Sequence, residues 1–101
     1  MADKPWDWTQ EDDYWRQNYR NRPYFSTRGG EYDFYQPGYR YGYEAANRYE
    51  GRSWDDVESD LERDWSNYQY RGSSTWEQIK DAARDAWDRV TGRRTVGSRS
   101  Y

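Results

Sequence analysis

The stretch SWDDVESDLERDW, residues 53–65, is followed by a second stretch of the same design, TWEQIKDAARDAW, at residues 75–87. Each begins with a hydroxyl residue and a tryptophan, and each ends with another tryptophan eleven positions after the first. Apolar residues also recur at i+3 and i+7, which keeps the whole set on one face of an α-helix. The pattern therefore predicts two amphipathic helices, over about residues 54–68 and 76–91. Their apolar faces consist of Trp54, Val57, Leu61 and Trp65 in the first copy and of Trp76, Ile79, Ala83 and Trp87 in the second.

The residue before each of these tryptophans is suited to start a helix. Ser53 and Thr75 stand at the N-cap positions, where a hydroxyl oxygen can accept a hydrogen bond from a backbone N–H of the first turn. Gln78, three residues after Thr75, provides the second half of a capping box. Because only a short Gly-Ser segment at residues 72–74 separates the two copies, they are expected to form an antiparallel helix pair.

Two further helices are predicted on the N-terminal side of this pair. The first, over about residues 8–22, carries an aromatic stripe at i, i+7 and i+11 and ends before Pro23. The second, over about residues 39–50, ends at Gly51, which is a good C-cap residue. Residues 23–38 are expected to form a long aromatic loop, either a strap that lies over the helices or a binding loop. The expected fold is all-α, a small bundle of about four helices in one domain at residues 1–94, with a flexible basic tail at 95–101.

The core of this bundle is predicted to be aromatic, because aliphatic residues are scarce. The chain of 101 residues has 7 Trp and 12 Tyr, and each of these side chains can bury roughly 150–250 Å². Such residues can supply the apolar area that the few Leu, Ile and Val residues do not. The residues expected in or near the core are Trp8, Trp15, Trp54, Val57, Leu61, Trp65, Trp76, Ile79 and Ala83.

Composition argues against several classes of function. The chain has no Cys and no His, so it lacks thiol chemistry and both the commonest general base and the commonest transition-metal ligand. We therefore predict that the protein is not an enzyme, that it has no catalytic residues, and that it needs no cofactor, metal or small-molecule substrate. No apolar run reaches the roughly 18 residues that a membrane span needs, and the N-terminus MADKPWDW lacks the order of a signal peptide. The predicted location is cytoplasmic.

The aromatic residues also suggest how the protein could act. Six or seven tryptophans are more than a bundle of this size is expected to bury, so some are predicted to form a contact with another copy or with a protein partner. Arg and Tyr alternate at residues 39–41 and 68–71, which favours stacking within the chain over a stacking surface for bases or sugars. The candidate interaction residues are Trp6, Tyr39, Tyr41, Tyr43, Trp87, Arg93 and Arg94.

Two alternative functions remain open from the sequence. One is a polyanion or nucleic-acid binder that uses Arg93, Arg94 and Arg99 with the Arg-Tyr segments. The net charge of −3, with both signs interspersed, makes nucleic-acid binding the weaker hypothesis. The other is a carbohydrate-binding or envelope-contacting module that uses exposed aromatic rings.

Three segments resemble a family of small bacterial proteins, or C-terminal segments of larger ones, that are associated with the stress response. The segments are a Tyr-x-Tyr-Gly-Tyr motif at residues 39–43, an acidic helix that begins with Trp and ends in Arg-Asp-Trp at 54–65, and a final Trp-led helix at 76–87. The resemblance covers roughly residues 12–94. It implies a bacterial source and a stress context, and it carries over no catalytic residue.

Overall fold

The protein is described here from a computed structural model, which describes residues 8–72 and 74–98, the last six of them as backbone alone. All the regular structure in these residues is helical, so the predicted all-α class is correct. No helix among them combines the length and the apolar composition that crossing a bilayer requires. In chain order the elements are α1 (Trp8–Asn18), the 3₁₀ helix η1 (Tyr19–Asn21), α2 (Pro23–Arg28), α3 (Tyr32–Arg48), α4 (Trp54–Trp65) and α5 (Trp76–Ser98).

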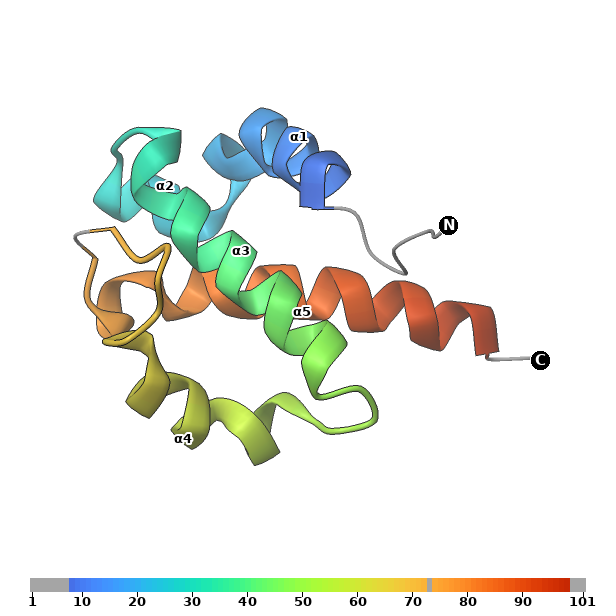
Figure 1. Ribbon diagram of the computed structural model, residues 1–101. Helices are drawn as coiled ribbons and strands as arrows, with labels where there is room; N and C mark the ends of the chain where they lie inside the picture. Colours follow the sequence, from blue (N-terminus) through green and yellow to red (C-terminus); the bar gives the residue numbers. More distant parts are fainter. Residues whose placement is uncertain (1–7, 73, 99–101) are drawn as a thin grey trace.

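Helices α3 and α5 cross at the centre of the molecule, and the other helices surround this pair. Figure 1 shows α1 on one side of the crossing and α4 on the opposite side, with α5 continuing past the body of the fold toward the C-terminus. Helix α3 is therefore in contact with neighbours on several of its faces. This central position explains why the tyrosines of α3 are buried.

The crossing is close because α3 presents glycines to α5. A Cβ atom on Gly38 would stand 2.2 Å from Cγ1 of Ile79, and one on Gly42 would stand 1.9 Å from the carbonyl oxygen of Ala83. Both distances are far inside van der Waals contact, so no side chain fits at either position. The two glycines therefore let the α3 backbone rest on one face of α5, where Ala82, Ala83 and Ala86 are also buried.

The two helices of the repeat begin where their caps predict. Ser53 Oγ accepts a hydrogen bond from the Asp56 N–H at 3.2 Å. Thr75 and Gln78 form the capping box: the Gln78 N–H donates to Thr75 Oγ1 at 3.3 Å, and the Thr75 N–H donates to Gln78 Oε1 at 3.0 Å. The tryptophans of the two copies pack on each other, because the Trp54 ring lies 6.2 Å from that of Trp76 and 5.7 Å from that of Trp87. The repeat thus joins two helices of the same chain.

The loop predicted at residues 23–38 is wrong. Pro23 begins α2. A proline is tolerated at the first position of a helix, because the backbone N–H that it lacks would have no hydrogen-bond partner within the helix there. Gly29 and Gly30, both with positive φ, then make the turn into α3. Pro37 lies inside α3, and the close packing of this helix on α5 outweighs the backbone hydrogen bond that the proline removes.

The predicted helix bounds also change. The helix expected at 39–50 begins at Tyr32 and ends at Arg48, and the one expected at 54–68 ends at Trp65. The last helix continues to Ser98 instead of ending near residue 91, so part of the segment predicted to be a tail is helical. Residues 99–101 lie outside the described residues.

The core is aromatic, as the composition predicts. Eight of the nine residues expected there are buried, and the ninth, Trp8, is half-buried and packs against the core. None of the residues predicted for the core lies in α3, yet this helix contributes a large share of it. The buried α3 residues are Tyr32, Tyr35, Pro37, Gly38, Tyr39, Tyr41, Gly42, Tyr43, Ala45 and Ala46.

Candidate functional site

Four of the predicted interaction residues belong to the core. Tyr39, Tyr41, Tyr43 and Trp87 are between 0% and 4% exposed, so their rings are not presented to a partner in this fold, and their assignment to a surface is corrected. For the three tyrosines the physical reason is the central position of α3, which packs on α5 and on its flanking elements. Trp87 belongs to α5 and is covered by Trp54 of α4, whose ring lies 5.7 Å away. Trp6 lies outside the described residues, as do the side chains of Arg93 and Arg94 at the end of α5.

The described tryptophans are likewise accommodated within one chain. Five of them are at most 6% exposed and Trp8 is half-buried. Among the described tryptophans, only Trp8 is therefore left partly free for the predicted contact with another copy or with a protein partner.

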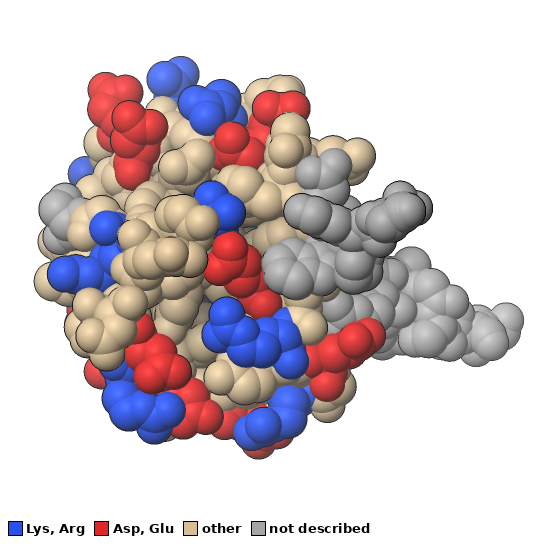
Figure 2. Space-filling view, in the orientation of Figure 1, with Lys and Arg blue, Asp and Glu red and all other residues tan. Residues whose placement is uncertain are grey.

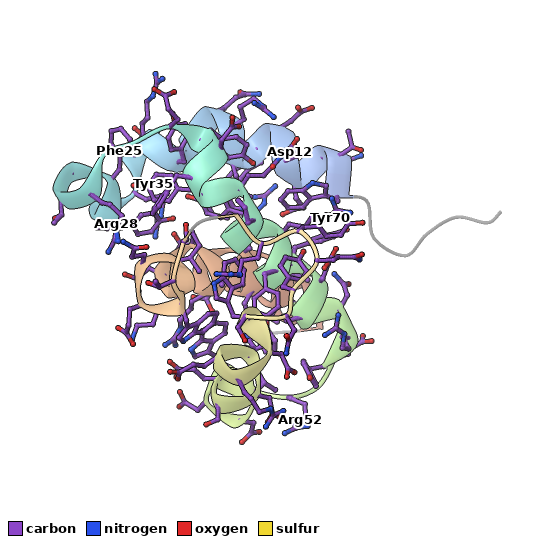
Figure 3. All side chains as sticks on the ribbon, turned by 60° about the vertical axis from the view of Figure 1, so that its left-hand side comes forward. Asp12, Phe25, Arg28, Tyr35, Arg52 and Tyr70 are labelled. Atoms are coloured by element: carbon purple, nitrogen blue, oxygen red, sulfur yellow. The ribbon has the colours of Figure 1, made fainter. Side chains whose placement is uncertain are left out.

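Most of the aromatic rings in and around the core form two clusters, one on each side of the α3–α5 crossing. The α1-side cluster consists of Tyr14, Trp15, Tyr19, Tyr24, Phe25, Tyr32, Phe34, Tyr35 and Tyr39. The α4-side cluster consists of Tyr41, Trp54, Trp65, Tyr68, Tyr70, Trp76 and Trp87. In Figure 3, Tyr35 of the α1-side cluster lies between α3 and α2, on the same side of α3 as Phe25.

Four of the buried or half-buried phenols are anchored by hydrogen bonds. Tyr41 donates to the Leu61 carbonyl at 2.7 Å, Tyr35 donates to the Gly29 carbonyl, and the hydroxyls of Tyr24 and Tyr39 lie 2.6 Å apart. Burial raises the pKa of each of these four tyrosines above its ordinary value. The groups therefore stay protonated and act as structural donors.

Two ion pairs tie the N-terminal helices to α5. Glu11, which is 2% exposed, accepts from Arg89 Nε at 3.0 Å, and the Arg89 guanidinium lies 3.5 Å from the centre of the Tyr14 ring. Arg22 makes a bidentate pair with Asp85, at 2.7 and 3.0 Å. Such two-point contacts fix orientation as well as distance.

Asp12 joins α1 to the start of α3. It accepts hydrogen bonds from the Tyr32 hydroxyl at 2.7 Å, from Gln36 Nε2 at 3.0 Å and from Arg16 Nη2 at 3.3 Å. Burial opposes ionisation of this carboxyl, but the three donors outweigh it and lower the pKa of Asp12. The carboxylate therefore works as a structural junction.

A shallow groove of about 510 Å³ lies between α2 and α5. Three arginines and three aspartates line it, together with Pro23, Tyr24 and Thr27: Arg22, Arg28, Arg84, Asp81, Asp85 and Asp88. Arg22 is held by Asp85, and Arg84 lies 3.8 Å from Asp88. Burial raises the pKa of Asp88. Arg84 lowers this pKa and nearby Asp85 raises it, and the net pKa is above the ordinary value. With its charges balanced and partly paired, the groove selects no particular ligand charge.

A second surface combines aromatic rings with one arginine. We call it the aromatic edge and define it by Trp8, Arg40, Glu44, Tyr68 and Tyr70. The Arg40 guanidinium lies 3.9 Å from the centre of the Tyr70 ring and 5.9 Å from that of Trp8. Arg40 Nε also donates to Glu44 at 3.0 Å, and the Tyr68 hydroxyl donates to the same carboxylate at 2.9 Å. Tyr70 is 45% exposed, and Figure 3 shows it near the beginning of α1, away from Arg28 and Phe25 of α2.

The alternation of Arg and Tyr was the sequence signal for this edge. Stacking within the chain is what the structure shows for Arg40 on Tyr70, as the preferred interpretation predicts. The sequence could not show that a residue of α3 meets the segment after α4, because this contact spans 30 positions and depends on the crossing of α3 and α5.

Charge on the rest of the surface is mixed. Figure 2 shows basic and acidic side chains interspersed over the face that it draws. Among the described residues, no group of three or more acidic side chains is placed to hold a metal ion. Comparison with protein-family models, curated proteins and solved structures gives no significant match to this chain.

Proposed function

We propose that the protein is a non-enzymatic interaction protein that binds another protein chain through the aromatic edge. The observation that carries this proposal is the arginine stacked on an exposed tyrosine beside a half-buried tryptophan. Trp, Tyr and Arg are the residues that contribute most to binding at protein interfaces. The partner is either a second copy of the chain or a different protein. A role in bacterial stress response rests on the sequence resemblance alone.

The edge is preorganised for binding, which supports the proposal. Glu44 orients Arg40 and Tyr68 at once, and its side chain is only 18% exposed. Side chains already held in one conformation lose less entropy when a partner binds, so more of the contact energy appears as affinity. The other described aromatic with large exposure, Tyr14 at 36%, provides a comparison, since an arginine also covers its ring.

Site-specific photo-crosslinking tests the proposal. A benzophenone amino acid is placed at position 70 in one variant and at position 14 in the other, and each protein is irradiated in its native cells. We expect a discrete crosslinked product from position 70 and none of comparable yield from position 14. The mass of the product tells a second copy from a different protein.

Alanine variants of the edge extend this test. Tyr70→Ala and Arg40→Ala are expected to weaken binding of the crosslinked partner at least tenfold, which corresponds to about 1.4 kcal/mol, whereas Tyr14→Ala leaves it unchanged. Equal crosslinking from both positions, or binding that survives both edge variants, would contradict the proposal. Light scattering at micromolar concentration decides separately whether copies of the chain associate.

A further inference from the structure

The α4-side cluster contains a continuous series of rings that runs from the core to the surface. Successive ring centres lie 5.7, 6.2, 6.4, 5.7 and 5.6 Å apart. The series ends at Tyr70, the most exposed of its members. In order, its members are Trp87, Trp54, Trp76, Trp65, Tyr68 and Tyr70.

Tryptophan and tyrosine are the side chains of this protein that lose an electron most readily, because it has no Cys and only one Met. Rings that are nearly in contact exchange an electron without needing any intervening group. We propose that the α4-side cluster is a relay for oxidising equivalents, which carries them from its buried tryptophans to Tyr70 at the surface. The oxidant is a one-electron radical.

Each step of the relay transfers one electron between neighbouring rings. A one-electron oxidant takes an electron from a tryptophan ring, and that ring is restored by an electron from the next ring in the series. At the end of the series Tyr70 gives up one electron to the oxidised neighbour and its phenolic proton to water. The net reaction converts the oxidant to its reduced form, Tyr70 to the phenoxyl radical, and releases one proton.

Tyr68 has a proton acceptor within hydrogen-bond distance, which lets it transfer the oxidising equivalent to Tyr70. Its hydroxyl donates to Glu44 Oε1 at 2.9 Å, so the carboxylate can accept the phenolic proton when Tyr68 loses an electron and can return it when Tyr70 restores that electron. Glu44 is itself held by Arg40 at 3.0 Å, and the same arginine lies over the Tyr70 ring. The proton acceptor and the two tyrosines are therefore fixed relative to each other.

The test begins with radicals formed on tryptophan itself, by flash photoionisation in the presence of an electron scavenger. The variants are Tyr70→Phe, the double variant Tyr68→Phe/Tyr70→Phe, and Tyr14→Phe as the matched control in the α1-side cluster. Each substitution keeps the aromatic ring, and circular dichroism checks that the fold is retained. Two quantities are measured: the first-order conversion of tryptophanyl to tyrosyl radical, and the permanent oxidation of each tryptophan by peptide mapping.

In the double variant we expect the conversion of radicals formed on the α4-side tryptophans to fall several-fold and oxidation of Trp54, Trp76 and Trp87 to rise several-fold. Tyr41, 5.1 Å from Trp65, does not replace the two tyrosines, because its hydroxyl donates to the Leu61 carbonyl, which cannot take up the phenolic proton. The single Tyr70→Phe variant keeps the conversion at Tyr68 but forms no radical at the surface position. Tyr14→Phe leaves oxidation of the same three tryptophans unchanged. The relay is overturned if the double variant and Tyr14→Phe show the same conversion and the same pattern of tryptophan oxidation.

Discussion

At Gly42 the absence of a side chain is a packing requirement. A Cβ atom there would meet the backbone of Ala83 at 1.9 Å, and backbone has no alternative rotamer with which to move aside. Gly92, a glycine of α5, differs in this respect, because a Cβ atom there meets nothing within 4 Å. The same substitution at these two positions therefore separates packing from helix propensity.

We expect Gly42→Ala to lower the free energy of unfolding by about 2 kcal/mol or more, because α3 must move away from α5. Gly92→Ala is expected to raise it by up to about 1 kcal/mol, since alanine favours the helix and nothing opposes the added methyl group. Urea denaturation of the two variants and the parent protein measures both effects. Equal stability of the two variants would show that the crossing is looser than described.

At the scale of single elements, the N-caps decide where α4 and α5 begin. Replacing Ser53 or Thr75 by alanine removes the acceptor for a first-turn N–H, and each change is expected to cost about 1 kcal/mol of stability. Ser59→Ala is the control, because Ser59 is an exposed residue within α4 and alanine is the better helix former there. Thermal unfolding of the three variants provides the measurement. A Ser59→Ala variant as unstable as Ser53→Ala would remove the cap as the cause.

These caps and the tryptophan stripes explain why the sequence predicts α4 and α5 well. Both signals are local, so they can be recognised within about a dozen residues. Helix α3 is the opposite case, because Pro37 and Gly38 are a turn signal by themselves. Only the contact of Gly38 with Ile79, 41 positions away, shows why the chain stays helical there. No local pattern in the sequence indicates that contact.

At the scale of the whole molecule, the same limitation affects the candidate site. Composition correctly predicts an aromatic core, because little else in the chain can fill one. Which rings are buried depends on the position of α3 between its neighbours, and for that reason Tyr39, Tyr41 and Tyr43 were assigned to a surface that does not contain them. Tyr70 was not predicted as a site residue, because its exposure follows from how the segment after α4 lies against α3.

A core made of tyrosine has a consequence for stability in alkali. Burial raises the pKa of six tyrosines above the ordinary value of 10.0: Tyr24, Tyr32, Tyr35, Tyr39, Tyr41 and Tyr68. In the unfolded chain the same phenols ionise near pH 10. Above this pH the folded state therefore binds more protons than the unfolded chain. As far as these groups are concerned, the free energy of unfolding is constant below about pH 10 and falls as the pH rises beyond it.

We expect the protein to unfold cooperatively in alkali, with tyrosinate absorbance from the buried phenols rising together with the loss of near-ultraviolet circular dichroism. Tyr41→Phe removes one of the six groups, so it should reduce the slope of unfolding free energy against pH by about 1.4 kcal/mol per pH unit above pH 10. At neutral pH the same variant is expected to be less stable by about 1 kcal/mol, because the Leu61 carbonyl loses its donor. The two effects have opposite signs in alkali, so the stabilities of the variant and the parent protein converge as the pH rises. Tyrosinate absorbance that appears fully before the circular dichroism changes would show that the phenols ionise in the folded state, and the core would then be more open to solvent than its burial implies.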